Sequence, residues 1–172
     1  MPFTTLDLSK QSGTSLPSSI VTASGLSTGK IGQVVQSLNS TVQSLTSGTL
    51  TQVSPTASIT PTATSSKVLA IFNCPLLMAN TAASYGEARM YRDTTELRLF
   101  HDMMAYTESI GGNIKTATQI CHFEYLDSPN TTSSITYSMK FAEHGSSTLY
   151  INNSSGSGGV GTSSMTLMEV LA

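Results

Sequence analysis

The feature that most constrains the fold is that this chain has many hydroxyl side chains and few charged ones with which to solvate its surface. It contains 28 serines and 25 threonines, but only 18 of its 172 residues carry a charge. Charged residues therefore make up 10% of the chain, against about 25% in an average globular domain. Hydroxyl groups must solvate most of the surface, and threonine is also a good strand former. This composition favours an all-β structural protein over a cytosolic α/β enzyme.

The charge balance and the hydropathy pattern argue against two classes of partner. The formal net charge is −2, whereas phosphate binding to nucleic acid needs a basic patch. No apolar run approaches the roughly 20 residues that a membrane-spanning helix requires. The opening MPFTTLDLSKQ has neither the basic start nor the apolar run of a secretory signal. We expect no nucleic-acid binding and no membrane insertion.

The N-terminal region differs from the rest of the chain. Of the 18 charged residues, only three precede position 67. Residues 1–28 are punctuated by QSGTSLPSS and TASGLSTG and have no sustained apolar period. Alone, such a stretch cannot bury enough surface to offset the entropy of ordering it. We expect residues 1–28 to form an extended attachment leader, either disordered or ordered against a partner, and residues 29–172 to form a β-head domain.

The first part of the head is predicted to be strands. Residues 31–46 also show helical spacing, but their β-branched and hydroxyl content favours a strand, with a helix as the alternative. Residues 67–74, KVLAIFNC, form a nearly continuous apolar run. Such a run predicts a central strand that is covered on both faces.

The second part of the head alternates strands and turns. We expect a hairpin over residues 84–100 that turns at Asp93–Thr95, followed by a loop-rich connection over residues 101–119. The next strand should place Cys121, Phe123 and Tyr125 on one face. A further strand pair turns at His144–Ser146, and SSMTLMEVLA supplies the final strand. About eight strands at fairly even spacing predict a β-sandwich or a β-barrel, and a jelly-roll-like sandwich fits the strand count best.

Two cysteines lie in apolar, strand-like sequence. We interpret Cys74 and Cys121 as buried free thiols, with a disulfide between them as the alternative. A metal site could be imagined from Cys121 and His122 together with His101 and Asp102. Neighbouring residues of a strand point to opposite faces, so Cys121 and His122 are badly placed to bind one ion.

No catalytic signature stands out. A serine hydrolase needs a strained turn such as G-x-S-x-G to present its nucleophile, but Gly156-Ser157-Gly158 sits in a loop without apolar neighbours to hold it. The same loop lacks the lysine and the following helix of a phosphate-binding loop. We expect no enzymatic activity, no cofactor and no metal.

The sharpest functional candidate is the segment HDMMAYTESIGGNIK, residues 101–115. Long loops on β-heads commonly carry binding functions, and sugars are held by aromatic faces flanked by polar groups. The alternative is that Met103, Met104 and Tyr106 only pack over the end of the sandwich or against a neighbouring subunit. The receptor-contact candidates are His101, Asp102, Tyr106, Glu108 and Asn113.

Several stretches, taken in order, resemble a known family. GKIGQVVQS opens the head, SITPTATSSKVLAIF introduces the next strand, and SSMTLMEVLA closes it, with ARMYRDTTEL and FEYLDSPNTTSSITYSMKF between them. This arrangement resembles the C-terminal domain of tailed-bacteriophage fibre and virion structural proteins, especially of marine and cyanobacterial phages. The resemblance covers residues 29–172. The leader is similar to the Ser/Gly-rich connectors of such proteins, although it lacks their Gly-Gly-Thr-Gly turn.

The resemblance implies a virion appendage with an exposed β-sandwich head. It further implies a homotrimer, attached to other virion proteins by the N-terminal leader, whose head recognises a host glycan or protein receptor. The alternative within the same class is a capsid-decorating head fibre or a cement protein. Either function would place the protein on the virion, at the tail or on the capsid surface.

Overall fold

The computed structural model describes residues 30–79, 84–107, 117–155 and 159–171. Every regular element in these ranges is a β-strand, so the all-β prediction is confirmed, and the strand interpretation of residues 31–46 holds over residues 31–39 and 43–45. The leader predicted for residues 1–28 lies outside the described residues. The strands are β1 (Lys30–Asn39), β2 (Gln43–Leu45), β3 (Thr51–Ile59), β4 (Lys67–Ala79), β5 (Ser84–Arg92), β6 (Thr95–Thr107), β7 (Ala117–Asp127), β8 (Ile135–His144), β9 (Thr148–Ile151), β10 (Asn153–Ser155), β11 (Gly159–Val160) and β12 (Ser163–Leu171).

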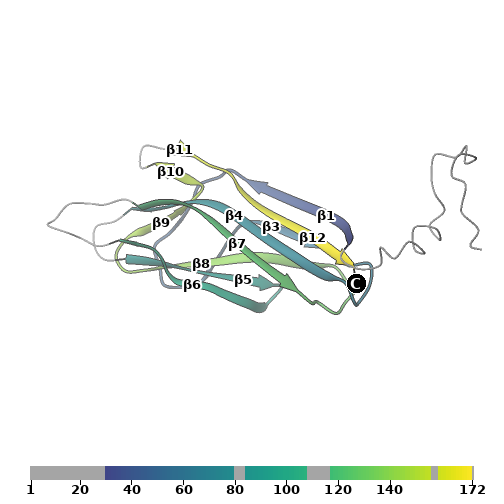
Figure 1. The fold of residues 1–172 in the computed structure, drawn as a ribbon. Helices are drawn as coiled ribbons and strands as arrows, with labels where there is room; N and C mark the ends of the chain where they lie inside the picture. The colour runs from purple at the N-terminus through teal and green to yellow at the C-terminus, as the bar shows by residue number, and fades with distance from the viewer. Residues whose placement is uncertain (1–29, 80–83, 108–116, 156–158, 172) are drawn as a thin grey trace, which may run out of the picture.

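The strands form two antiparallel sheets and one short hairpin (Figure 1). The six-stranded sheet has the order β1-β12-β4-β9-β2, with β7 paired along the other edge of β4. The four-stranded sheet has the order β3-β8-β5-β6, and β10 pairs with β11. When β1 and β2 are counted as one interrupted strand, β9 and β12 as another, and the β10–β11 hairpin is set aside, eight strands remain. Their order is that of a jelly roll, which confirms the predicted fold class.

The interruption between β9 and β12 has a local cause in the long central strand β4, with which both strands pair. The first half of β4 pairs with β12, from Lys67 to Asn73, and the second half pairs with β9, from Leu76 to Ala79. Pro75 lies at the junction, where its carbonyl accepts a hydrogen bond from the backbone N–H of Asn152 at 2.9 Å. Because proline has no N–H to donate, a regular ladder cannot continue through this position. The β10–β11 hairpin occupies the chain between β9 and β12.

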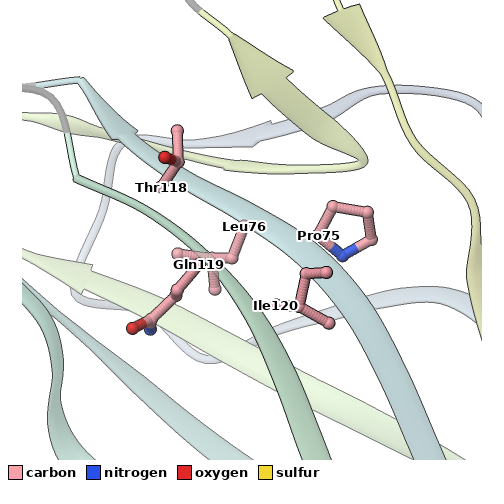
Figure 2. Close-up of a pocket in the computed structure, with 5 residues that line it drawn as sticks. All are labelled: Pro75, Leu76, Thr118, Gln119 and Ile120. Carbon is pink, nitrogen blue, oxygen red and sulfur yellow. The ribbon is translucent and has the colours of Figure 1, made fainter.

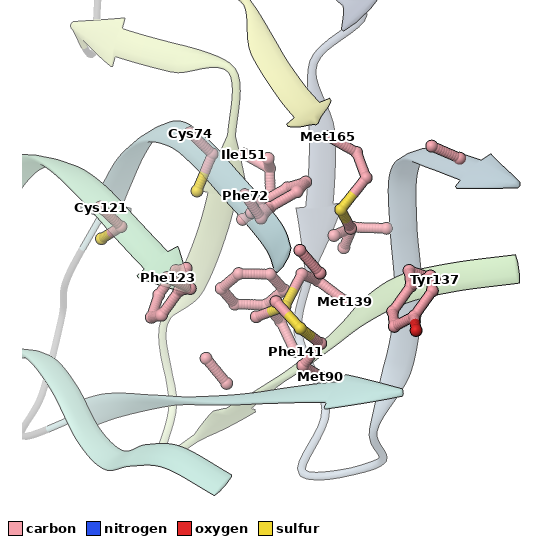
Figure 3. Close-up of a cluster of buried hydrophobic side chains, with 14 of the residues drawn as sticks. Phe72, Cys74, Met90, Cys121, Phe123, Tyr137, Met139, Phe141, Ile151 and Met165 are labelled. Atoms are coloured by element: carbon pink, nitrogen blue, oxygen red, sulfur yellow. The ribbon is translucent and has the colours of Figure 1, made fainter. Parts of the chain in front are cut away.

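The core lies between the two sheets and is built from alternate residues of each strand (Figure 3). Phe72 of β4, Phe123 of β7 and Phe141 of β8 form its aromatic centre, with ring centroids 5.9–6.5 Å apart. Met90, Met139 and Met165, which are fully buried, fill the space around these rings. Such aromatic contacts add about 0.5–1.5 kcal/mol per pair beyond their area burial.

The predicted strand periodicity is largely confirmed. Phe123 and Cys121 face the core and Tyr125 packs against it, and the β5–β6 hairpin turns at Asp93, which has a φ of 50°. Two predictions were wrong. The connection predicted for residues 101–119 is partly strand, because β6 runs to Thr107 against β5 and β7 begins at Ala117. The other wrong prediction is that β4 is covered on both faces, since Leu69 on its outer face is only half-buried.

Candidate functional site

The outer face of the six-stranded sheet is unusually apolar for a face that points away from the core. On β4, Val68, Ala70 and Phe72 face inward and are fully buried, so their neighbours in the strand face outward. An antiparallel sheet with one solvated face normally carries polar residues there. Here the outer apolar face consists of Ile31 and Val34 of β1, Met168 and Val170 of β12, Leu69 and Ile71 of β4, and Leu126 of β7.

The strand register aligns four of these residues in one row across the sheet. Val34 pairs with Met168, Met168 with Leu69, and Leu69 with Leu126. Val34 is 56% exposed and Leu126 is 48% exposed, while the two residues between them are half-buried. β1, β12, β4 and β7 lie side by side in Figure 1, which makes this cross-sheet row continuous. A contiguous apolar surface of this kind marks an interaction site more often than a free surface.

A shallow pocket of about 320 Å³ extends from the same sheet near the break in β4. It is lined by Pro75 and Leu76 of β4 and by Thr118, Gln119 and Ile120 of β7 (Figure 2). Pro75 and Ile120 are cross-strand partners, and Ile120 is 84% exposed. The lining carries no charge, so this pocket suits an apolar side chain of a partner better than a polar reaction.

The outer face of the four-stranded sheet carries a network of charged side chains instead. Arg89 of β5 is ion-paired with Glu87 and also donates to Glu96 of β6 at 2.8 Å. His144 of β8 lies 2.9 Å from the second oxygen of Glu87. The Tyr91 hydroxyl donates to Glu96 at 3.1 Å. Three neighbouring strands are therefore tied together by one chain of polar contacts.

Aromatic rings complete this network and leave little free ring surface. The ring of Tyr85 stacks on His144 with centroids 4.9 Å apart, and the ammonium of Lys140 lies 4.0 Å from the ring centre of Tyr91. Because these ring faces are already occupied, a sugar could stack on them only by displacing a neighbour. The network is better suited to holding β5, β6 and β8 together than to binding a ligand.

The electrostatics agree with a self-satisfied network. Burial by itself would raise the pKa of Glu87, but hydrogen bonds from His144 and Arg89 outweigh it and lower the pKa below its ordinary value. The pKa of Tyr91 is raised, first by burial and then by its hydrogen bond to Glu96. Both shifts favour the protonation states that the contacts need near neutral pH, so the network gains no reactive acid or base from them.

Two buried carboxylates join distant parts of the sandwich. Glu169 of β12 accepts hydrogen bonds from Gln33 at 2.8 Å and from the backbone N–H of Thr62 at 2.7 Å. Burial opposes ionisation of Glu169, yet these hydrogen bonds lower its pKa to about 2. Asp127 of β7 pairs with Arg92 and accepts a hydrogen bond from Tyr137, both at 2.7 Å, which links the two sheets. We interpret both carboxylates as structural, because they are buried and each joins segments that are distant in sequence.

The receptor-contact candidates predicted from the sequence fall in two places. His101, Asp102 and Tyr106 belong to β6, where His101 pairs with Ala88 of β5. Glu108 and Asn113 lie outside the described residues. The predicted receptor contact therefore begins on a sheet strand and not on a long loop, and it remains a prediction.

The metal-site residues are arranged as strand geometry requires. Cys121 is buried in the core, whereas the side chain of His122 is 54% exposed on the outer face and donates a hydrogen bond from Nδ1 to the amide oxygen of Asn73 at 2.6 Å. Cys74 and Cys121 are direct cross-strand partners and are both free thiols (Figure 3). Within the part of the chain that the structure describes, no three His, Cys, Asp or Glu residues are placed to hold a metal ion. Among those same residues, no helix is long and apolar enough to cross a membrane.

The outer apolar face and the charged network were both missed by the sequence analysis. A signal for the network was present, since Glu87 and Arg89 alternate on one strand and Glu96 follows the turn. The apolar face has a weaker signal, because its residues come from four strands that are distant in sequence. Only the register brings Val34, Leu69 and Leu126 into line.

Comparisons with known proteins report similarity of fold at low sequence identity. No protein-family model matches the chain, and no curated protein is similar to it in sequence. Among solved structures, it is similar to VP2 of infectious bursal disease virus in a subviral particle, at 14% identity and a TM-score of 0.43, covering 81% of this chain and 38% of that one. The Gx strain of the same virus gives 12% identity and a TM-score of 0.34 over 83% of this chain and 39% of that one. The chain thus spans less than two fifths of the virus proteins that it matches.

Proposed function

We propose that this protein is a non-enzymatic structural protein of a tailed-bacteriophage virion, a fibre or spike subunit that displays a jelly-roll head. The observation that carries the proposal is the outer apolar face, with its row of four aligned side chains. A sandwich that leaves such a face open is built as a subunit of an assembly. The hydroxyl-rich surface and the resemblance of residues 29–172 to phage fibre heads support the same function.

In this proposal residues 1–28 attach the subunit to other virion proteins. The strand β1 begins next to the end of β12, since Lys30 pairs with Leu171, so the leader joins the head at one end of the sandwich (Figure 1). The opposite end is then free to point outward. The resemblance further implies a homotrimer formed through the leader and a head that contacts a host glycan or protein receptor.

Localisation on the particle tests the proposal. Gold-labelled antibody against the head, applied to purified particles, should decorate the tail or its spikes. Absence of the protein from purified particles would refute a structural function in the virion. Deleting residues 1–28 should leave a head that melts like the full chain but no longer enters particles. Normal incorporation of that variant would refute the assignment of attachment to the leader.

A second candidate function, a capsid-decorating head fibre or a cement protein, is favoured by one observation. The outer apolar face lies on the side of the sandwich and not at its tip. A protein that binds flat on a capsid shell would need its contact surface in that position. Antibody label on the capsid surface would support decoration over the fibre function.

Receptor contact is tested separately from incorporation. The variants Asp102→Ala and Tyr106→Ala should reduce adsorption of particles to host cells while the amount of protein per particle stays constant. Unchanged adsorption for both variants would remove His101, Asp102, Tyr106, Glu108 and Asn113 as the receptor-contact set. Hydrolysis of host polysaccharide by the purified protein would contradict the non-enzymatic function.

A further inference from the structure

The central strand β4 poses a problem that the single chain does not solve. Its sequence has the nearly continuous apolar pattern of a strand that is buried on both faces. In the structure the four-stranded sheet covers one face, while on the other face Leu69 and Ile71 stay half-buried although Leu77, farther along the strand, is buried. The apolar composition of this part of β4 is therefore that of a strand with a further layer packed on its outer face, which the single chain does not supply.

The charges beside the cross-sheet row indicate what covers this face. Lys67 precedes Leu69 by two residues on β4 and is exposed. Glu124 of β7 is paired with Ile71, two residues after Leu69, and its side chain is 64% exposed. Each two-residue step along a strand is about 7 Å. The two opposite charges thus lie on opposite sides of the same apolar row.

We propose that the outer apolar face packs against the same face of a second copy of this chain, about a two-fold axis that runs along the cross-sheet row. Such an axis superimposes the row on itself and exchanges its two flanks. Lys67 of one copy then lies directly opposite Ile71 of the other copy. Glu124 is on the strand next to Ile71, so it is displaced sideways from Lys67 by only one strand spacing, about 4.8 Å. Two equivalent Lys67–Glu124 pairs close the interface, as an isologous contact requires.

The alternative in-plane axis fits the charges less well. A two-fold axis along the strands would keep each flank facing itself, so that Lys67 would meet Val170 and Glu124 would meet Gln36. Neither charge would then have a partner of opposite sign in the other copy, although Glu124 lies 3.4 Å from His122 of its own chain. Face-to-face sheets about 10 Å apart are an ordinary packing of β-sandwiches, and the contact does not depend on where the protein sits in a particle.

The first experiment measures the mass of the full chain in solution by light scattering after gel filtration. Val34→Lys and Leu126→Lys each place a charge in the row and should halve the mass of the parent assembly, whatever the leader contributes to it. Leu99→Lys is the matched control, because Leu99 is 44% exposed on the four-stranded sheet. A parent protein that is already a single copy, or a mass that neither row variant changes, would overturn the proposal.

The second experiment tests the axis by exchanging charges. Lys67→Glu and Glu124→Lys should each weaken self-association by on the order of tenfold, since each leaves two like-charged contacts. The double variant should restore self-association to within a few-fold of the parent, because both pairs re-form with reversed sign. Within one chain the two residues are separated by four positions along β4, so an intramolecular pair cannot explain the rescue. A double variant as weak as the single ones would overturn this axis.

Discussion

The outer faces of the two sheets solve the same problem in opposite ways. Both belong to strands whose other face is buried in one shared core, and both look away from it. On the four-stranded sheet, Glu87, Arg89, Glu96 and His144 pair with one another and hold three strands together. On the six-stranded sheet, the aligned residues are apolar and have no partner above them within the described chain. The polar contacts of one face are thus made within the subunit, whereas we propose that the other face is covered by a second copy.

The same difference appears in what each face would lose when it is altered. A change in the charged network should cost stability of the single chain, because its partners lie in that chain. A change in the outer apolar face should cost association and leave the fold intact, because the row makes its missing contacts elsewhere. The predictions below are arranged around this contrast.

The largest expected effect comes from removing the strand that supports the apolar face. Deletion of residues 165–172 removes most of β12, which lies between β1 and β4 in the sheet. The deletion should abolish cooperative unfolding, because it takes two buried core residues, Met165 and Leu167, leaves β1 without a paired strand and exposes part of one edge of β4. Thermal unfolding followed by circular dichroism tests this expectation. A soluble variant that still melts cooperatively would contradict the closed sandwich.

A substitution in the core shared by both sheets should have the next largest effect. Phe141→Ala removes a fully buried ring from the aromatic centre and should lower the free energy of unfolding by about 3–5 kcal/mol. Urea unfolding measures the change. Phe100→Ala, a half-buried position, is the control and should cost clearly less. Equal losses for the two variants would mean that the core is not centred where the structure places it.

In the charged network of the four-stranded sheet, the buried carboxylate of Glu87 should contribute more to stability than the more exposed carboxylate of Glu96. Glu87→Ala leaves Arg89 and His144 without their shared carboxylate, whose side chain is only 11% exposed, and should cost about 1–3 kcal/mol. Glu96→Ala removes a side chain that is 37% exposed and should cost no more than about 1 kcal/mol. Urea unfolding of both variants tests the ranking. The reverse ranking would show that the network is not organised around Glu87.

Acid should weaken the edge of the sheet that carries the apolar face. The pKa of Glu169 is about 2 in the folded protein, against an ordinary value of 4.5. As the pH falls, the unfolded chain binds this proton first, so the stabilisation from ionised Glu169 is present above pH 4.5 and is lost between pH 4.5 and 2. Glu169→Gln should be less stable at pH 7 and show a flatter dependence over that range. An identical pH profile for the two proteins would rule out this role for Glu169.

The smallest effect on the stability of the fold is expected from a substitution in the outer apolar face of the six-stranded sheet. Leu126→Thr should change the free energy of unfolding by less than about 0.5 kcal/mol, because the side chain is 48% exposed and lies outside the core. The measurement is made at a concentration where the protein is a single copy or where association is blocked by Val34→Lys. A loss of several kcal/mol would place Leu126 in the core of the subunit.

The sequence alone determined the fold class and most of the strand faces. The alternation of Ile120 and His122 with Cys121 and Phe123 predicts which side of β7 is buried, and the structure confirms it. This works because side-chain direction in a strand depends only on the position along that strand. Local pattern failed in β6, where register shifts against β5 interrupt the alternation and the strand continues past Phe100.

The tertiary structure decided everything that depends on which strands are neighbours. Lys30 and Leu171 are paired although they stand at opposite ends of the head, and Val34 meets Leu126 in one row through two intervening strands. Register between distant strands is set by burial of the whole sheet and leaves no mark in a short stretch of sequence. For that reason the composition predicted a hydroxyl-coated sandwich, while the location of the apolar row could be read only after the strands had been placed side by side.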